Sequence, residues 1–142
     1  MATLAELYQG VIIEHDRSPR NFRTLAAPTH RAEGTNPLCG DEVSLELSVN
    51  SVGQITDVAF QGRGCAVSKA SASLLTTAVQ GKTVEEAREL FDGFHGLLTG
   101  KPLPNVKLGK LAVFEGLAAY PMRVKCATLA WHAMKQALDE TK

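Results

Sequence analysis

The sequence has few of the features that mark nucleic-acid-binding or membrane proteins. Fifteen Lys and Arg residues balance fifteen Asp and Glu residues, so the formal net charge at pH 7 is zero. No broad electrostatic field therefore favours nucleic acid or an acidic membrane as a partner. The N-terminal stretch mixes acidic residues among its apolar ones, so it predicts neither a signal peptide nor a transmembrane segment. We expect a cytoplasmic protein that binds neither nucleic acid nor membrane.

Cysteine is also scarce, with three residues in a chain of 142. An odd number of cysteines in a reducing compartment argues against a disulfide framework, and the sequence contains no C-x-x-C pair. The three thiols are then buried as small hydrophobic groups, catalytic, or bound to a metal. The length fits a single domain, 1–142, whose core needs no covalent staples.

The N-terminal region predicts one helix followed by extended chain. Thr3 and Glu6 have the spacing of a capping box, and apolar residues then recur at helical intervals until Ser18. Residues 22–38 are mostly polar and contain two prolines. This composition predicts extended chain with at most a short strand near residues 28–34.

A β-hairpin is predicted next. Residues 43–49 alternate apolar and polar side chains, which is the period-two pattern of a strand buried on one face. Turn-forming residues at 50–53 separate this segment from a second apolar run at 54–60. The two runs therefore predict an antiparallel pair.

The second half of the chain is dominated by helical spacing. Apolar and small residues recur three and four positions apart, and prolines and glycines fall between these runs rather than within the strongest of them. We expect helices over 65–79, from Thr83 toward Gly100, more weakly over 106–117, and after Pro121. Strands early and helices late predict an α+β fold, with a small antiparallel β-sheet and helices packed on one of its faces.

Topology brings one cysteine toward another. In an extended segment Cys39 and Asp41 present their side chains on the same side, and Gly40 leaves the space between them open. Cys65 directly follows the second strand of the hairpin, so it lies at the end of the hairpin where the first strand starts. It also opens a helix, and a helix N-terminus favours the thiolate form of cysteine.

Cys126 is placed less firmly, early in the last helix and beside its apolar stripe. Three thiolates and one carboxylate make a plausible four-ligand set for zinc or for iron in a small iron-sulfur cluster. From the residues alone, a metal site and three buried thiols remain open alternatives.

Three motifs resemble the U-type iron-sulfur cluster assembly proteins (IscU/SufU-like). They are N-P-x-C-G-D at 36–41, G-x-G-C-A-V-S-K-A-S-A-S at 62–73 and R-V-K-C-A-T-L-A-W-H-A at 123–133. The resemblance covers nearly the whole chain. It implies that Cys39, Asp41, Cys65 and Cys126 are ligands of zinc or of a transient [2Fe-2S] cluster, and that one cysteine accepts persulfide sulfur from a cysteine desulfurase.

Two features resemble the SufU-like branch, whose members are described as zinc-binding sulfur acceptors. Lys125 precedes the third cysteine, where scaffold members of the IscU type usually have histidine, and an extra segment lies within Gly100 to Gly116. By resemblance, Cys126 is the expected sulfur acceptor. The recipients downstream are then an iron-sulfur carrier, a scaffold or an apo-protein.

Two functions therefore remain: a scaffold that carries the cluster, and a zinc-dependent sulfurtransferase that relays sulfur without carrying one. In either case the protein acts with a desulfurase rather than as a stand-alone enzyme. A third interpretation, an interaction module with packed cysteines, predicts no bound metal. Arg63 and Lys125 are either charge partners of the thiolates or solvated basic residues. No motif links any of the four histidines to a thiol.

Overall fold

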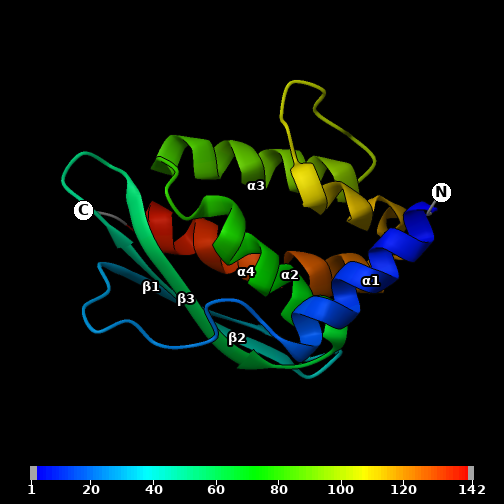
Figure 1. Cartoon of the computed structure of the whole chain (residues 1–142), viewed down its shortest axis with the longest axis horizontal. Coiled ribbons are helices and arrows are strands. Elements are labelled where there is room, and N and C mark those ends of the chain that lie inside the picture. Colours follow the sequence, from blue (N-terminus) through cyan, green and yellow to red (C-terminus); the bar gives the residue numbers. More distant parts are fainter. Residues whose placement is uncertain (1–2, 141–142) are drawn as a thin grey trace.

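The computed structural model describes residues 3–140, which form three strands and five helical segments (Figure 1). Along the chain, one helix precedes the sheet and the remaining helices follow it, as the sequence predicts. The helices are α1 (Leu4–Arg17), α2 (Ala66–Val79), α3 (Val84–Leu98), the 3₁₀ helix η1 (Gly109–Ala119) and α4 (Pro121–Asp139).

The sheet is an antiparallel meander of β1 (His30–Asn36), β2 (Asp41–Val49) and β3 (Ile55–Arg63), with β2 in the middle. Along β2 the buried residues alternate with less buried ones, because one face of the strand packs on the core and the other faces outward. Asn36 pairs with Asp41, and Glu42 pairs with Arg63. The start of β2 and the end of β3 therefore lie side by side.

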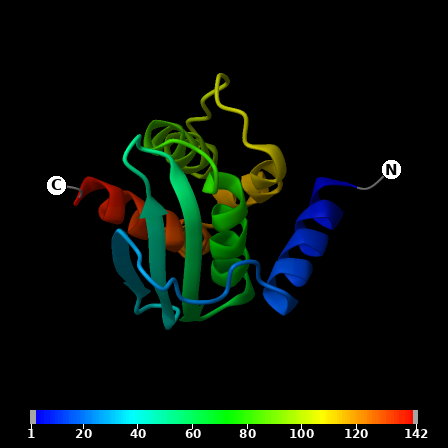
Figure 2. The same cartoon turned by 60° about the vertical axis from the view of Figure 1, so that its left-hand side comes forward.

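Helices cover one face of the sheet, which confirms the predicted α+β architecture (Figure 2). The long helix α4 packs against β1 and β2, whereas α2 packs against β3. Trp131 of α4 is fully buried in this layer, and its ring lies against Phe94 of α3 with centroids 4.9 Å apart. α1 packs mainly against α2 and η1.

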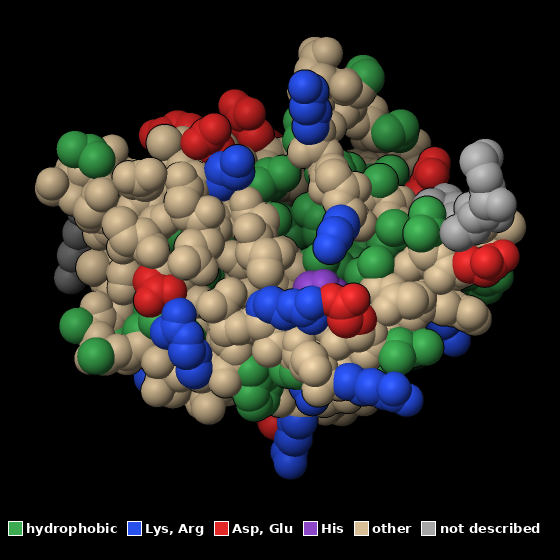
Figure 3. All heavy atoms as spheres, viewed as in Figure 1, with side chains coloured by type: hydrophobic (Ala, Val, Ile, Leu, Met, Phe, Trp, Pro, Cys, Tyr) green, Lys and Arg blue, Asp and Glu red, His purple; other side chains and the backbone are tan. Residues whose placement is uncertain are grey.

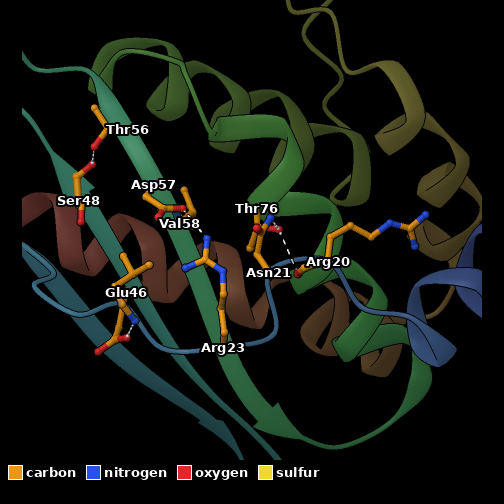
Figure 4. Close-up of polar contacts among 10 residues, drawn as sticks. Arg20, Asn21, Arg23, Glu46, Ser48, Thr56, Asp57, Val58 and Thr76 are labelled. Carbon is orange, nitrogen blue, oxygen red and sulfur yellow. Dashed lines mark hydrogen bonds and ion pairs between the residues drawn. The ribbon is translucent and has the colours of Figure 1, made fainter.

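The segment between α1 and β1 is tied to the sheet and to α2 by polar contacts (Figure 4). The Asn21 amide donates to the Thr76 hydroxyl at 2.9 Å, and the Arg23 guanidinium pairs with Asp57 at 2.7 Å. The backbone N–H of Leu25 donates to the Glu46 carboxylate at 2.8 Å. These contacts hold the crossing chain in place, although it has no regular secondary structure of its own.

Helix starts agree with the capping patterns in the sequence. Thr83 and Glu86 form a reciprocal capping box, and the Thr3 hydroxyl accepts from the backbone N–H of Glu6. Pro121 occupies the first turn of α4, where its missing N–H leaves no helical bond unmade.

Three details differ from the sequence-based expectations. The strand expected near residues 28–34 is β1, which runs on to Asn36 because its whole length pairs with β2. The weak helical stretch at 106–117 is a 3₁₀ helix. Leu7 belongs to the apolar stripe predicted for α1 but is 49% exposed, since α1 packs through only part of that stripe.

Within residues 3–140, no helix combines the length and the apolar character needed to cross a bilayer.

Candidate metal centre

Cys39 lies at the tip of the β1–β2 hairpin. Its backbone N–H donates to the carbonyl of Asn36 at 3.1 Å, which closes a turn with Pro37 at the position that proline favours. Gly40 follows with a φ of 72°, a conformation that glycine adopts without strain. Cys39 and Asp41 are thus brought together by a turn rather than by an extended segment, and the Cys39 side chain is exposed.

Asp41 connects the hairpin to the start of α2. Its carboxylate accepts from the backbone N–H of Cys65 at 2.9 Å, and its second oxygen lies 3.9 Å from the Cys65 sulfur. Cys65 is the N-cap of α2, and its sulfur accepts from the Ser68 N–H at 3.4 Å. A Cβ atom at Gly64 would lie 2.2 Å from the Asp41 carboxylate, so this contact requires glycine there.

Cys126 reaches the same point from the second turn of α4. Its sulfur lies 3.5 Å from that of Cys39, and the Asn36 side-chain amide approaches it at 3.8 Å. The ligand atoms of Cys39, Asp41 and Cys126 all lie within 4.8 Å of one another. Cys65 is outside this tight group, but its sulfur lies beside the Asp41 carboxylate and is also a neighbour of the Cys126 thiol.

The donor set fits a four-coordinate zinc ion. Tetrahedral zinc with Zn–S bonds of about 2.3 Å places its sulfur ligands about 3.8 Å apart. The separation of 3.5 Å between the sulfurs of Cys39 and Cys126 is close to that value. Three soft sulfurs with one oxygen also suit iron in a small cluster.

Burial is uneven across the four side chains. Asp41 and Cys126 are buried, at 1% and 4% exposed, whereas Cys39 and Cys65 are exposed. Burial raises the pKa of the Cys126 thiol, and its neighbours Asp41, Cys39 and Cys65 raise it further. The site concentrates groups that are negative when deprotonated, and a bound cation would stabilise the thiolate form of each.

A groove of about 710 Å³ leads to the three cysteines from between α1 and α4. Tyr8, Met122 and Arg123 line it, together with apolar residues of α1. Tyr8 and Arg123 also line an adjoining hollow of about 530 Å³ beside η1, a region where Figure 3 shows hydrophobic side chains gathered on the surface. Burial raises the pKa of Tyr8, and the charge of Arg123 partly offsets that effect.

Neither basic residue singled out in the sequence lines the groove at the three cysteines. Arg63 forms an ion pair with Glu42 at 2.7 Å and its side chain is 80% exposed, while Lys125 is also exposed. These observations favour solvated basic residues. The basic side chain in the groove is Arg123, three residues before Cys126; the i to i+3 spacing on a helix is the signal that could have identified it.

Sequence reasoning also did not identify Asn36 as a neighbour of the site, because its contact is with Cys126, 90 positions away.

The four histidines lie outside the group formed by Cys39, Asp41 and Cys126. His15 is buried against Ser73, with its Nδ1 2.7 Å from the hydroxyl oxygen, and His95 and His132 pack beside Phe91.

Comparison with known proteins connects this geometry to a family. Residues 7–127 match the family described as NifU-like N terminal domain. The chain is 39% identical to the iron-sulfur cluster assembly scaffold protein IscU of Streptococcus pyogenes serotype M1, over 99% of this chain and 88% of that protein. It is 35% identical to the zinc-dependent sulfurtransferase SufU of Bacillus subtilis, over 96% of this chain and 92% of that protein.

Solved structures agree with this relationship. The fold superposes with a TM-score of 0.86 on the putative iron-sulfur cluster assembly scaffold protein for the SUF system from Fervidobacterium islandicum, at 34% identity over 93% of this chain and 96% of that one. Family and fold both point to U-type iron-sulfur assembly proteins. The chain belongs to the NifU-like N-terminal domain family, which confirms the resemblance seen in its three motifs.

Proposed function

We propose that this protein, acting as one domain over residues 1–142, supports iron-sulfur cluster assembly by accepting persulfide sulfur at a site formed by Cys39, Asp41, Cys65 and Cys126. The observation that carries the proposal is the convergence of these side chains, from the β1–β2 hairpin, the start of α2 and α4, at the end of an accessible groove. Relatives named as an iron-sulfur scaffold and as a zinc-dependent sulfurtransferase support it.

The sulfur donor in this proposal is a cysteine desulfurase, which presents sulfur as a persulfide on a cysteine of its own. An acceptor thiolate attacks the outer sulfur of that persulfide, and the desulfurase cysteine leaves as a thiolate. Cys126 is the proposed acceptor. It is buried, but it lines the groove, so a donor segment inserted between α1 and α4 reaches its sulfur without unfolding the sheet.

Zinc is one proposed occupant of the site. Bound zinc would hold the three thiols deprotonated and fix their directions. The Asp41 carboxylate is buried and already held by the Cys65 N–H, so it needs no rearrangement to serve as the fourth ligand. The protein would then be a sulfurtransferase that relays sulfur, as the name of the Bacillus subtilis relative describes for that protein.

The second candidate function is a scaffold that carries a transient [2Fe-2S] cluster on the same four residues, as the name of the Streptococcus pyogenes relative suggests for that protein. Here iron and sulfide are cargo, and one oxygen ligand among soft thiolates favours passing the cluster on. An iron-sulfur carrier, another scaffold or an apo-protein would receive it. A cytoplasmic location belongs to the proposal because the three free thiols require a reducing compartment.

The test is the zinc, iron and acid-labile sulfide content of protein purified without air, compared with Asp41→Ala. We expect a stoichiometric metal in the natural chain and an affinity at least about tenfold lower in the variant, since even the outer partners of metal ligands contribute that much. Asp57→Ala is the matched control, because Asp57 is an aspartate in an exposed ion pair with Arg23.

Each outcome separates the candidates. Zinc without sulfide supports the sulfurtransferase, and iron matched by sulfide supports the scaffold. A chain that binds neither, with Asp41→Ala indistinguishable from the natural protein, would support an interaction module with packed cysteines and overturn the proposal.

A further inference from the structure

The sulfur atoms of Cys39 and Cys126 lie 3.5 Å apart. That separation lies at the upper end of the range of about 3 to 3.5 Å at which reacting atoms are already placed for attack. We infer a further activity that rests on the proposed sulfur-acceptor function: Cys39 resolves a persulfide on Cys126 and releases the transferred sulfur as hydrosulfide.

The step is balanced without an external reagent. Cys39 gives up its proton to solvent, and its thiolate attacks Sγ of Cys126, the inner sulfur of the persulfide. A bond forms between the two Sγ atoms while the bond from Cys126 Sγ to the outer sulfur breaks. The outer sulfur leaves with the bonding pair as HS⁻. It gains two electrons, and the two cysteine sulfurs lose one each as they become a disulfide.

Position makes Cys39, rather than Cys65, the attacking group. The Cys65 sulfur caps α2 by accepting from Ser68, lies beside the Asp41 carboxylate, and is outside the tight group that contains Cys126. Cys39 is exposed at the tip of a hairpin, next to the positive-φ Gly40, so it can approach Cys126 without disturbing a helix.

The released hydrosulfide also needs a path out of the site, and the groove provides one. All three cysteines line its volume of about 710 Å³, so the hydrosulfide formed at Cys126 has a path to solvent. A metal bound to both Cys39 and Cys126 would oppose this step, because a disulfide between them removes two thiolate ligands from the metal at once. The activity therefore belongs to the metal-free chain, which ends as a Cys39–Cys126 disulfide and requires a dithiol reductant before it can accept sulfur again.

The experiment uses reduced full-length protein stripped of metal by a chelator under nitrogen. Glutathione persulfide supplies the sulfur, so the result does not depend on a desulfurase. Intact mass and peptide mapping then distinguish a chain that has gained one sulfur atom from a chain that has lost two hydrogens to a disulfide. Cys39→Ser, Cys39→Ala and Cys65→Ser are treated in parallel, and circular dichroism confirms that each variant is folded.

We expect the natural chain to release sulfide and to contain a Cys39–Cys126 disulfide, and we expect any disulfide formed in Cys65→Ser to be this same one. Both Cys39 variants should keep the added sulfur on Cys126, with release slowed at least about tenfold, since the resolving thiol would have to come from another molecule. A persulfide that persists equally in the natural chain, or a disulfide that joins Cys65 to Cys126, would overturn the inference. Failure of a desulfurase to load the chain would instead count against the proposed function.

Discussion

Two places along α4 bury polar groups in opposite ways. Near Trp131 the indole N–H donates to the Ser71 hydroxyl at 3.1 Å, and that hydroxyl in turn donates to the carbonyl of Ala127. Every polar group in this set finds a complement inside the protein. Near Cys126, five residues earlier, a buried thiol instead meets the carboxylate of Asp41 and a second thiol.

The comparison separates a part of the helix whose polar groups are satisfied within the protein from a part that is suited to the proposed ligand. Around Trp131 each hydrogen-bond donor of this set has an acceptor within the protein, so these contacts contribute to stability alone. Around Cys126 the side chains are mainly electron-pair donors, and Asn36 is the buried side-chain N–H donor that approaches the sulfur among the described residues. A cation from outside would complement these groups, as the proposed metal site assumes.

The largest effect on stability is expected from the closed part of α4. Trp131→Ala removes a fully buried ring and should lower the free energy of unfolding by about 3 to 5 kcal/mol, measured by denaturant titration of metal-free protein. Met122→Ala, on the same helix but 50% exposed, is the control and should change it by less than about 0.5 kcal/mol. A Trp131→Ala protein that also loses zinc binding while still folded would break the distinction between the two regions.

A smaller loss of stability, but a direct loss of metal, is expected at Gly64. Alanine there would be strained at a φ of 149°, and its Cβ would collide with Asp41; we expect a cost of about 1 to 3 kcal/mol together with weaker zinc binding. Gly100→Ala is matched to it, because Gly100 also has a positive φ, of 79°, but has open space around its Cβ position.

Zinc titration and thermal unfolding of the two glycine variants separate backbone strain from damage to the site. Both should lose stability, whereas only Gly64→Ala should lose metal affinity. Equal zinc affinities in the two variants would show that the close approach to Asp41 does not matter for the metal centre.

The smallest effect concerns pH and a buried group outside both regions. Burial lowers the pKa of His15 below its usual value of 6.5, and the charge of Arg20 lowers it further. Below pH 6.5 the unfolded chain therefore binds more protons than the folded chain, so stability falls as the pH drops from 6.5 toward the folded-state pKa.

His15→Gln should flatten this dependence between about pH 7 and 5.5 when unfolding is followed by denaturant. Some slope should remain, because burial also lowers the pKa of His132. An unchanged slope would mean that His15 is not protonated differently in the two states.

Several structural features could be predicted from sequence because their causes are local. The alternation along β2 requires only that one face of the strand be buried, and the side-chain cap at Thr3 and the capping box at Thr83 act over a single turn. The hairpin and the helix that follows it also place Cys65 near Asp41, because the connection of three elements leaves little choice. The three motifs were sufficient to identify the family.

The tertiary structure decided what local periodicity cannot express. Packing of α4 against β1 buries Cys126 and leaves Cys39 exposed at the hairpin tip, and the gap between α1 and α4 brings Tyr8 and Arg123 to the same groove. These relationships join residues more than 80 positions apart. A sequence pattern reports which face of an element is apolar, whereas the element that covers this face, and how completely, depends on the whole chain folding around it.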